Sequence, residues 1–372
     1  MEIEASDKQG QDRAPESLCS MSAGLMTRLE RLGIALAFTS YQSGYLYMLG
    51  SHPEHGAQLH QSAVAKPMGL AAQGNELVLS TGNGMIRYRN ILRPGERANH
   101  IFDACYVPRV QYFTGELDAH DVGIEADGQP VFVNTRFNCL AHLSIVDSFE
   151  PLWRPPFISA LVAEDRCHLN GLAMQDGAPA YVTAISRSDT IDGWRDRRSA
   201  GGVAMHVPSG RIVAEGLSMP HSPRLHDGRL WLLNSGAGEV GSLADDGRFV
   251  PLAFCPGFTR GLAFHGQLAF VGLSKPRYKR FEGLVLDERL RQADSEPWCG
   301  IQVIDLGSGE CVDWFRFDGP VEELYDVAVI PGRRCPMALS PTSPELNTLV
   351  TFPAEPSLAA VQPVPLGEVL KI

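Results

Sequence analysis

The sequence contains no apolar run of about 18 residues, the length that a membrane-spanning helix needs. It also has no block of lysine and arginine, and its formal net charge is −11, from 32 basic and 43 acidic residues. Because a nucleic-acid backbone is bound by clustered positive charge, we expect neither a nucleic acid nor a membrane as partner. The segment Met1–Ser20 is polar and acidic, unlike a signal peptide, so we expect a cytoplasmic protein.

Paired cysteine spacings and nucleotide-binding motifs are missing as well. The eight cysteines are scattered without a CxxC pair, which predicts buried, reduced thiols rather than a disulfide scaffold. No Gly-x-Ser-x-Gly, Walker or Rossmann fingerprint is present, so an α/β-hydrolase, a nucleotidase and a dehydrogenase lose their usual support.

Glycine is abundant, and it punctuates a repeat. There are 37 glycines and 26 prolines, with many short apolar runs broken by Asp-Gly or His-Gly. A unit of strand, glycine turn, second strand and polar loop, as in His168-Leu-Asn-Gly-Leu-Ala-Met-Gln-Asp-Gly177, begins near residues 66, 120, 168, 221, 258 and 325. Most units are followed by a second strand pair, such as Gly202–Val207 with Arg211–Glu215. Four antiparallel strands per unit are typical of a blade, so we predict an all-β, six-bladed β-propeller.

The last unit has almost no chain behind it, and three strands precede the first unit. Ile34–Thr39, Tyr45–Leu49 and Gln58–Ser62 have the pattern of the second to fourth strands of a blade. We expect these closing strands, within residues 33–62, to complete the C-terminal blade, because this closes the ring and removes its free edges.

The domain organisation follows from this closure. We expect a disordered tail over residues 1–18, a single propeller over residues 19–335, and a Pro-rich segment, 336–372, packed on the propeller. A short helix is expected within Met21–Leu32. Two insertions, Ser186–Ala200 and Lys275–Pro297, are expected to project from one face.

The innermost strand of each blade starts near the axis, so equivalent residues converge there. Three residues before the glycine of each unit, or its substitute, the sequence places Lys66, His120, His168, His221, Phe258 and Tyr325. Three converging imidazoles suit a mononuclear divalent transition metal (Fe, Zn, Mn, Ni or Cu) on His120, His168 and His221. Two alternatives stay open: the imidazoles hydrogen-bond in a polar channel, or one of them moves a proton without a metal.

Further polar residues are expected on the same face. As groups that move protons the sequence offers Asp121, Glu323 and Tyr325. As substrate-binding residues it offers Lys66, Arg136, Asn134, Asn170, Asn234, Arg260, Lys275, Tyr41 and Gln42. The cations among them favour an anionic substrate, although they could instead pair with nearby carboxylates such as Asp121 and Asp326.

Several long motifs resemble those of a bacterial family. They include Tyr106-Val-Pro-Arg, Trp153-Arg-Pro-Pro-Phe-Ile-Ser-Ala-Leu, Gly216-Leu-Ser-Met-Pro-His-Ser-Pro-Arg and Pro256-Gly-Phe-Thr-Arg-Gly-Leu-Ala-Phe. The match, from about Ser40 to Gly332, is to an uncharacterised family of conserved hypothetical, β-propeller-like proteins. The resemblance implies no activity and no catalytic residues. Lys66 stands where this family is expected to have arginine.

Three functions remain in view. The first is a metal-dependent enzyme, a lyase or cyclase, hydrolase or oxygenase, that acts on a small anionic metabolite or modified peptide. The second is a non-catalytic propeller that binds a peptide or glycan on the same face. The third is a hydrolase similar to lactonases of the SMP-30/gluconolactonase type, with a carboxylate-bound divalent ion. The sequence does not determine the oligomeric state.

Overall fold

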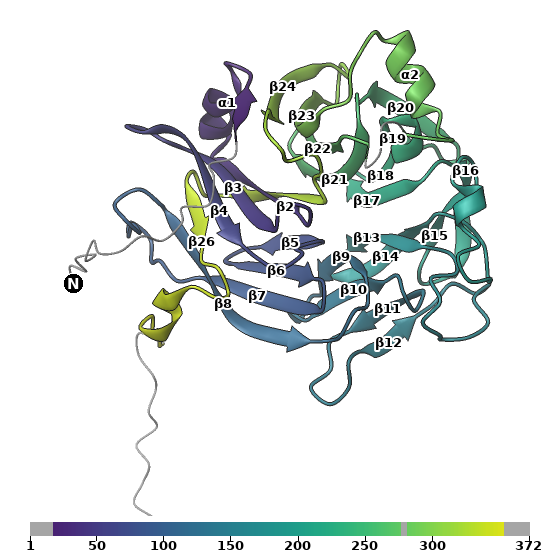
Figure 1. The fold of residues 1–372 in the computed structure, drawn as a ribbon, viewed down its shortest axis with the longest axis horizontal. Helices are drawn as coiled ribbons and strands as arrows, with labels where there is room; N and C mark the ends of the chain where they lie inside the picture. Colours follow the sequence, from purple (N-terminus) through teal and green to yellow (C-terminus); the bar gives the residue numbers. More distant parts are fainter. Residues whose placement is uncertain (1–17, 277–280, 353–372) are drawn as a thin grey trace, which may run out of the picture.

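The computed structural model describes residues 18–276 and 281–352. Figure 1 shows six sheets arranged around a common axis, which confirms the predicted six-bladed β-propeller. We number the blades by the order of their innermost strands in the chain. In each blade the strands are given from the axis outward. Blade 1 consists of β5 (Leu70–Gln73), β6 (Glu76–Thr81), β7 (Gly84–Asn90) and β8 (Ala104–Phe113), and blade 2 of β9 (Ala119–Ile124), β10 (Pro130–Asn134), β11 (Cys139–His142) and β12 (Glu150–Trp153). Blade 3 consists of β13 (Leu169–Gln175), β14 (Ala178–Ala184), β15 (Gly202–His206) and β16 (Arg211–Leu217).

The other half of the ring contains the closure. Blade 4 consists of β17 (Pro220–His226), β18 (Arg229–Asn234), β19 (Glu239–Leu243) and β20 (Phe249–Phe254), and blade 5 of β21 (Phe258–His265), β22 (Leu268–Ser274), β23 (Cys299–Asp305) and β24 (Cys311–Phe317). Blade 6 consists of β25 (Asp326–Pro331), β2 (Ile34–Ser40), β3 (Tyr45–His52) and β4 (Gly56–Ala63). β25 pairs antiparallel with β2, so strands from both ends of the propeller share one sheet. The predicted closure is therefore confirmed.

Aromatic packing stabilises the joint between blades 5 and 6. The ring of Phe38 on β2 lies 5.3 Å from that of Tyr47 and 5.5 Å from that of Phe315 on β24. Helix α1 (Leu25–Leu32) adds the fully buried Leu25 and Leu29 to this cluster. Because these side chains come from both ends of the propeller, their burial holds the ring closed.

Two short strands extend the outer edges of blades. β1 (Cys19–Met21) pairs with β24, and β26 (Pro336–Ala338) pairs in parallel with β8. The helix expected within Met21–Leu32 begins at Leu25, because Met21 belongs to β1 and residues 22–24 connect that strand to the helix. Residues 1–17 of the expected tail and residues 353–372 of the Pro-rich segment lie outside the described residues.

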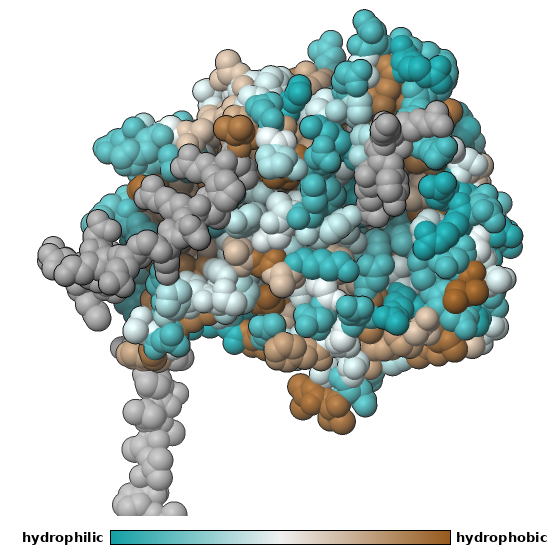
Figure 2. Space-filling view, viewed as in Figure 1, coloured by the Kyte–Doolittle hydropathy of each residue, from teal (hydrophilic) through white to brown (hydrophobic). Residues whose placement is uncertain are grey.

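Short helices lie in the connections. Helix α2 (Leu286–Gln292) belongs to the second insertion, and 3₁₀ turns cover Arg195–Arg197, Ser235–Ala237 and Pro344–Asn347. None of the helices in the described part of the chain is long and apolar enough to span a membrane. Figure 2 shows a largely hydrophilic face, with an apolar tip at the loop between β11 and β12, where Ile145 and Val146 are 94% and 86% exposed.

Hydroxyl groups link neighbouring blades near the axis. At or just beyond the end of the second strand of five blades, a serine or threonine donates a hydrogen bond to a carbonyl beside the next inner strand. The pairs are Thr39 to Met68 (2.6 Å), Ser80 to Ala119 (2.8 Å), Thr135 to Leu169 (2.5 Å), Ser235 to Thr259 (2.7 Å) and Ser274 to Leu324 (3.0 Å). These bonds fix which residues occupy equivalent positions in different blades.

Candidate functional site

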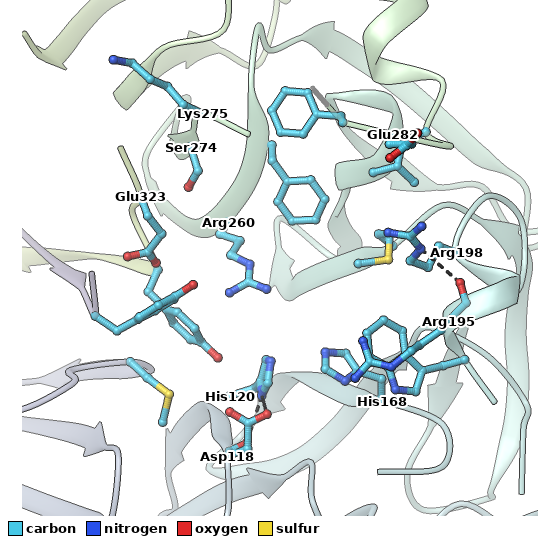
Figure 3. A pocket seen from close by; sticks show the side chains of 18 of the residues that line it. Asp118, His120, His168, Arg195, Arg198, Arg260, Ser274, Lys275, Glu282 and Glu323 are labelled. Atoms are coloured by element: carbon cyan, nitrogen blue, oxygen red, sulfur yellow. Dashed lines mark hydrogen bonds and ion pairs between the residues drawn. The ribbon is translucent and has the colours of Figure 1, made fainter. Parts of the chain in front are cut away.

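A cavity of about 850 Å³ lies at the end of the axis where both insertions gather. Figure 3 shows Arg260 in its middle, with His120 and Asp118 facing it from one side and Glu323 from another. The lining residues are Tyr41, Lys66, Met68, Asp118, His120, His168, Trp194, Arg195, Arg198, Met219, Phe258, Arg260, Ser274, Lys275, Phe281, Glu282, Leu284, Glu323 and Tyr325. Its size is that of pockets that enclose small molecules.

The inter-blade hydroxyl bonds show that the site residues come from two positions, not one. Because each acceptor carbonyl has the same place in its blade, the residue that follows it occupies an equivalent position in each blade. These residues are Gly69, His120, Asn170, Arg260 and Tyr325. Two residues earlier in the chain stand Pro67, Asp118, His168, Phe258 and Glu323, which are equivalent to one another in turn.

His221 belongs with His120. Ser222 after it accepts the Gly261 amide of the next blade, as Asp121 after His120 accepts the Leu172 amide. His168 is therefore two residues out of register with the other two imidazoles. Counting from the glycines was wrong here, because the register of β13 shifts between Leu169 and Gly171 and that of β21 between Thr259 and Leu262.

The imidazole of His120 is oriented by neutral acceptors. Its Nδ1 lies 2.9 Å from the carbonyl oxygen of Asp118 and 2.8 Å from Oγ1 of Thr135, whose proton goes to Leu169. Nδ1 therefore carries the hydrogen, and the Nε2 lone pair is left for the cavity. Burial and the nearby charges of His168 and Arg260 outweigh the carboxylate of Asp118 and lower the pKa of His120 to about 4.

His168 has a charged partner instead. Its Nδ1 lies 2.8 Å from Oδ2 of Asp165, and the same oxygen accepts a 3.0 Å hydrogen bond from the indole of Trp194. The Trp194 ring packs 4.2 Å from the imidazole. Trp194 of the first insertion thus helps to fix the position of His168. The rings of His168 and His120 lie 4.8 Å apart.

His221 is buried behind the cavity wall rather than in it. Its ring packs 5.4 Å from that of Phe258, and its Nδ1 faces the carbonyl of Met219 at 2.8 Å and the Ser235 hydroxyl at 3.1 Å. Burial, and then the charge of Arg260, hold the pKa of His221 well below its ordinary value. Its Nε2 is buried and has no hydrogen-bond partner among the described residues.

Arg260 is the central cation. It is 8% exposed, and its guanidinium carbon lies 4.8 Å from the ring of Tyr325 and 5.7 Å from that of Phe258. In the part of the chain that the structure describes, no carboxylate forms an ion pair with it. Because a buried charge is costly without a counter-charge, this guanidinium is suited to hold an anion that enters the cavity.

Tyr325 and Glu323 line the cavity beside Arg260, as the sequence predicted for their blade. Burial raises the pKa of Tyr325 well above its ordinary value, so its phenol keeps its proton and can donate a hydrogen bond. Glu323 is held by the Ser40 hydroxyl at 3.1 Å. Burial opposes ionisation of Asp118, but the neighbouring His120, His168, Lys66 and Arg260 lower its pKa below the ordinary value.

Asp121, expected to move protons, does not line the cavity. Its carboxylate lies deeper in the channel, 2.8 Å from Arg224 and 2.9 Å from the amide of Leu172. Asp326 holds the equivalent place in blade 6 and lies 3.8 Å from the same guanidinium. Burial and the charge of Asp121 raise the pKa of Asp326 to about 7. This charge cluster ties the inner strands together and assigns Asp121 a structural role.

Five expected substrate-binding residues also lie outside the cavity, and each is engaged within the fold. Asn134 binds the amide of Phe137, Asn170 the Thr183 hydroxyl, Asn234 the amide of Ser218, Arg136 the carbonyl of Glu116, and Gln42 the amide of Glu322. The expected residues that do line it are Tyr41, Lys66, Arg260 and Lys275.

Strained backbone accompanies the site. Five residues in or beside the cavity have a positive φ although they are not glycine: Lys66 (51°), Asp118 (53°), Asp165 (31°), His168 (52°) and Met219 (49°). Such conformations cost on the order of 1–3 kcal/mol each and collect where a fold must aim functional groups.

Several functional residues were missed by sequence reasoning. Asp118 and Asp165 precede a site histidine by two and three residues, a spacing that could have indicated them. Trp194, Phe281 and Leu284 come from the insertions and carry no local signal of where they fold back.

The three-histidine metal centre stays a prediction. Within residues 18–276 and 281–352, no group of three or more His, Cys, Asp or Glu side chains is placed so that it could hold a metal ion. This applies equally to a carboxylate-bound ion of the lactonase kind.

Comparison with known proteins shows the family of the chain. A family model described as Domain of unknown function (DUF4915) matches residues 23–339, and the chain belongs to that family. No curated protein matches the chain.

Several solved structures are similar to this chain at low identity, and the first of them, with a TM-score above 0.5, supports the fold. The nidogen/laminin complex contains a chain with a TM-score of 0.52 at 13% identity, covering 80% of this chain and 99% of that one. A protein of unknown function from Bacteroides caccae gives 0.47 at 11% identity, covering 80% and 98%. A streptogramin B lyase structure gives 0.39 at 12%, covering 64% and 72%.

Proposed function

We propose that this protein is an enzyme that binds a small anionic compound in the axial cavity and moves protons on it with the imidazoles of His168 and His120. The observation that carries the proposal is Arg260, a buried guanidinium without a described counter-ion, next to two imidazoles whose Nδ1 atoms are already engaged. Five cationic side chains against three carboxylates line the cavity of a protein that is acidic overall.

The roles follow from the contacts. Arg260 binds a carboxylate, phosphate or sulfate of the substrate and orients it. His168 is the general base: its Nε2 takes a proton from the substrate, while its Nδ1–H stays on Asp165, whose charge stabilises the imidazolium that forms. The phenol of Tyr325 donates a hydrogen bond to the oxygen on which negative charge develops. Proton abstraction of this kind suits a lyase or cyclase reaction.

A second candidate function uses the same imidazoles to hold a divalent transition metal. It is favoured by the Nδ1 atoms of His120, His168 and His221, which all face oxygen acceptors and so leave three Nε2 lone pairs, and by the unpartnered Nε2 of His221. Such a metal would polarise a substrate oxygen or activate water.

The anion site is tested by binding. A panel of small carboxylates, phosphate monoesters and sulfates is screened by thermal shift, and the best ligand is titrated into wild type and Arg260→Met. Loss of the guanidinium should weaken binding at least tenfold, by about 1.4 kcal/mol or more. Arg187→Met is the matched control, because Arg187 is 58% exposed and pairs with Glu215 outside the cavity.

Two outcomes contradict the proposal. If no anion prefers wild type over Arg260→Met, the cavity is not an anion site. If an anion binds and is turned over equally fast by wild type and His168→Gln, His168 is not the base. Binding without any turnover would favour the non-catalytic propeller.

A further inference from the structure

The cavity has two walls of different chemistry. One is polar, with Tyr41, Lys66, Asp118, His120, Glu323 and Tyr325 from blades 6, 1 and 2. The other is mainly apolar, and it is built by Trp194, Met219, Phe258, Phe281 and Leu284, from the two insertions and from blades 4 and 5. The insertions also add Arg195, Arg198 and Glu282 to the lining. A ligand that fills the cavity therefore meets polar groups on one side and mostly hydrocarbon on the other.

The apolar wall is continuous. The rings of Phe258 and Phe281 lie 6.2 Å apart with 25° between their planes. Phe258 and Leu284 also pack with Trp194 and Met219 in one cluster, which joins the two insertions. Trp194, Met219 and Phe281 are each 8% exposed and line the cavity, so a flat apolar group against them replaces water with aromatic contacts.

Arg260 stands where the two walls meet. Its guanidinium carbon is 4.8 Å from the ring of Tyr325 on the polar side and 5.7 Å from the ring of Phe258 on the apolar side. An anionic group bound to Arg260 thus lies at the beginning of the aromatic wall, with room for a ring to continue along it inside about 850 Å³.

We propose that the ligand of this cavity is an aromatic carboxylate: its carboxylate binds Arg260, and its ring system lies along Phe258 and Phe281. This inference rests on the proposed anion site and specifies the substrate class. A small polar anion would leave the wall of Phe258, Phe281 and Leu284 in contact with water, and a neutral aromatic compound would leave Arg260 without a counter-charge.

Isothermal titration with four probes tests the inference: 2-naphthoate, benzoate, acetate and the neutral 2-naphthalenemethanol. Wild type should bind 2-naphthoate at least tenfold more tightly than acetate and than the neutral alcohol. Phe281→Ala should weaken 2-naphthoate binding about fivefold or more and leave acetate unchanged. Phe264→Ala is the matched control, because this ring stacks on His226 at the far end of β21.

The outcomes separate the inference from the function on which it rests. In one outcome acetate and 2-naphthoate bind equally well, both lose affinity in Arg260→Met, and Phe281→Ala changes the affinity for neither. In that case the anion site is supported and the assignment of an aromatic ligand is wrong. If no probe loses affinity in Arg260→Met, the anion site falls as well. Thermal unfolding of each variant shows that a lost affinity does not come from a lost fold.

Discussion

The Nδ1 atom of His168 lies 2.8 Å from Oδ2 of Asp165, a contact that neither of the other two axial histidines has at this distance in the described structure. For His120 the nearby carboxylate of Asp118 stands at 3.6 Å, and the hydrogen bonds go to a carbonyl and a hydroxyl. A carboxylate stabilises an imidazolium, whereas a carbonyl mainly fixes the tautomer. For this reason we propose His168, and not His120, as the base.

Asp165→Asn should lower kcat by about 100-fold while KM for the anionic substrate changes by less than about threefold. The amide keeps one oxygen that can accept from both His168 and Trp194, but it removes the charge that stabilises protonated His168. Steady-state kinetics with a substrate found in the anion screen measures the changes in kcat and KM separately. Asp246→Asn, in an exposed turn, is the control. A rise in KM with unchanged kcat would make Asp165 a structural residue.

Mild acid should destabilise the fold through His120. Its pKa of about 4 lies below the value of 6.5 that it has when unfolded, so the unfolded state binds more protons between these values. Stability is therefore lost as pH falls from about 6.5 to 4, by up to roughly 3 kcal/mol. Urea unfolding at pH 7 and 4.5 measures the loss, which should be smaller in His120→Gln than in wild type. Exposed His55→Gln should behave as wild type does; an identical acid loss in His120→Gln contradicts the assignment.

Arg224→Met should destabilise the propeller by about 3–5 kcal/mol, because it leaves Asp121 and Asp326 facing each other. The pKa of Asp326 is already raised to about 7, and removal of the guanidinium raises it further. The folded state then binds extra protons, so the loss of stability grows as pH rises past 7. Urea unfolding at pH 5.5 and 8 measures this trend. Exposed Arg248→Met is the control, and a loss that is equal at both pH values would refute the coupling.

Metal analysis decides between the two candidate functions. Protein purified without a histidine tag should contain less than about 0.2 equivalents of Fe, Zn, Mn, Ni or Cu if the imidazoles act alone. About one equivalent, recovered by reconstitution and lost in His221→Ala, would instead favour the metal centre. Elemental analysis by mass spectrometry measures the number of metal equivalents per chain. Arg260-dependent anion binding after dialysis against a chelator is the accompanying control.

The blade repeat, the closure and part of the site were predictable from local patterns. The apolar runs and the glycine turns that define a blade lie within each strand pair. The missing strands of the last blade could be found by counting the strands before the first unit and after the last one. Tyr325 and Arg260 followed from their place at the start of an inner strand, because every such start lies near the axis.

The register between blades was not predictable in this way. Counting from the glycines set His168 beside His120 and His221, but the hydroxyl bonds between blades and the register shifts of β13 and β21 place it two residues away. A shift of this kind depends on hydrogen bonds to another blade, so no window of the chain contains it.

By itself the amino-acid sequence determined that six strand repeats close into a ring and that imidazoles and cations gather at its axis, since local periodicity and turn chemistry are enough for both. Only the tertiary structure decided that Asp165 and Trp194 hold His168, that Arg224 neutralises Asp121, and that Phe281 lines the cavity. Trp194 lies 29 positions from Asp165 and Arg224 lies 103 positions from Asp121, and Phe281 belongs to an inserted segment, so these residues come together only when the blades pack.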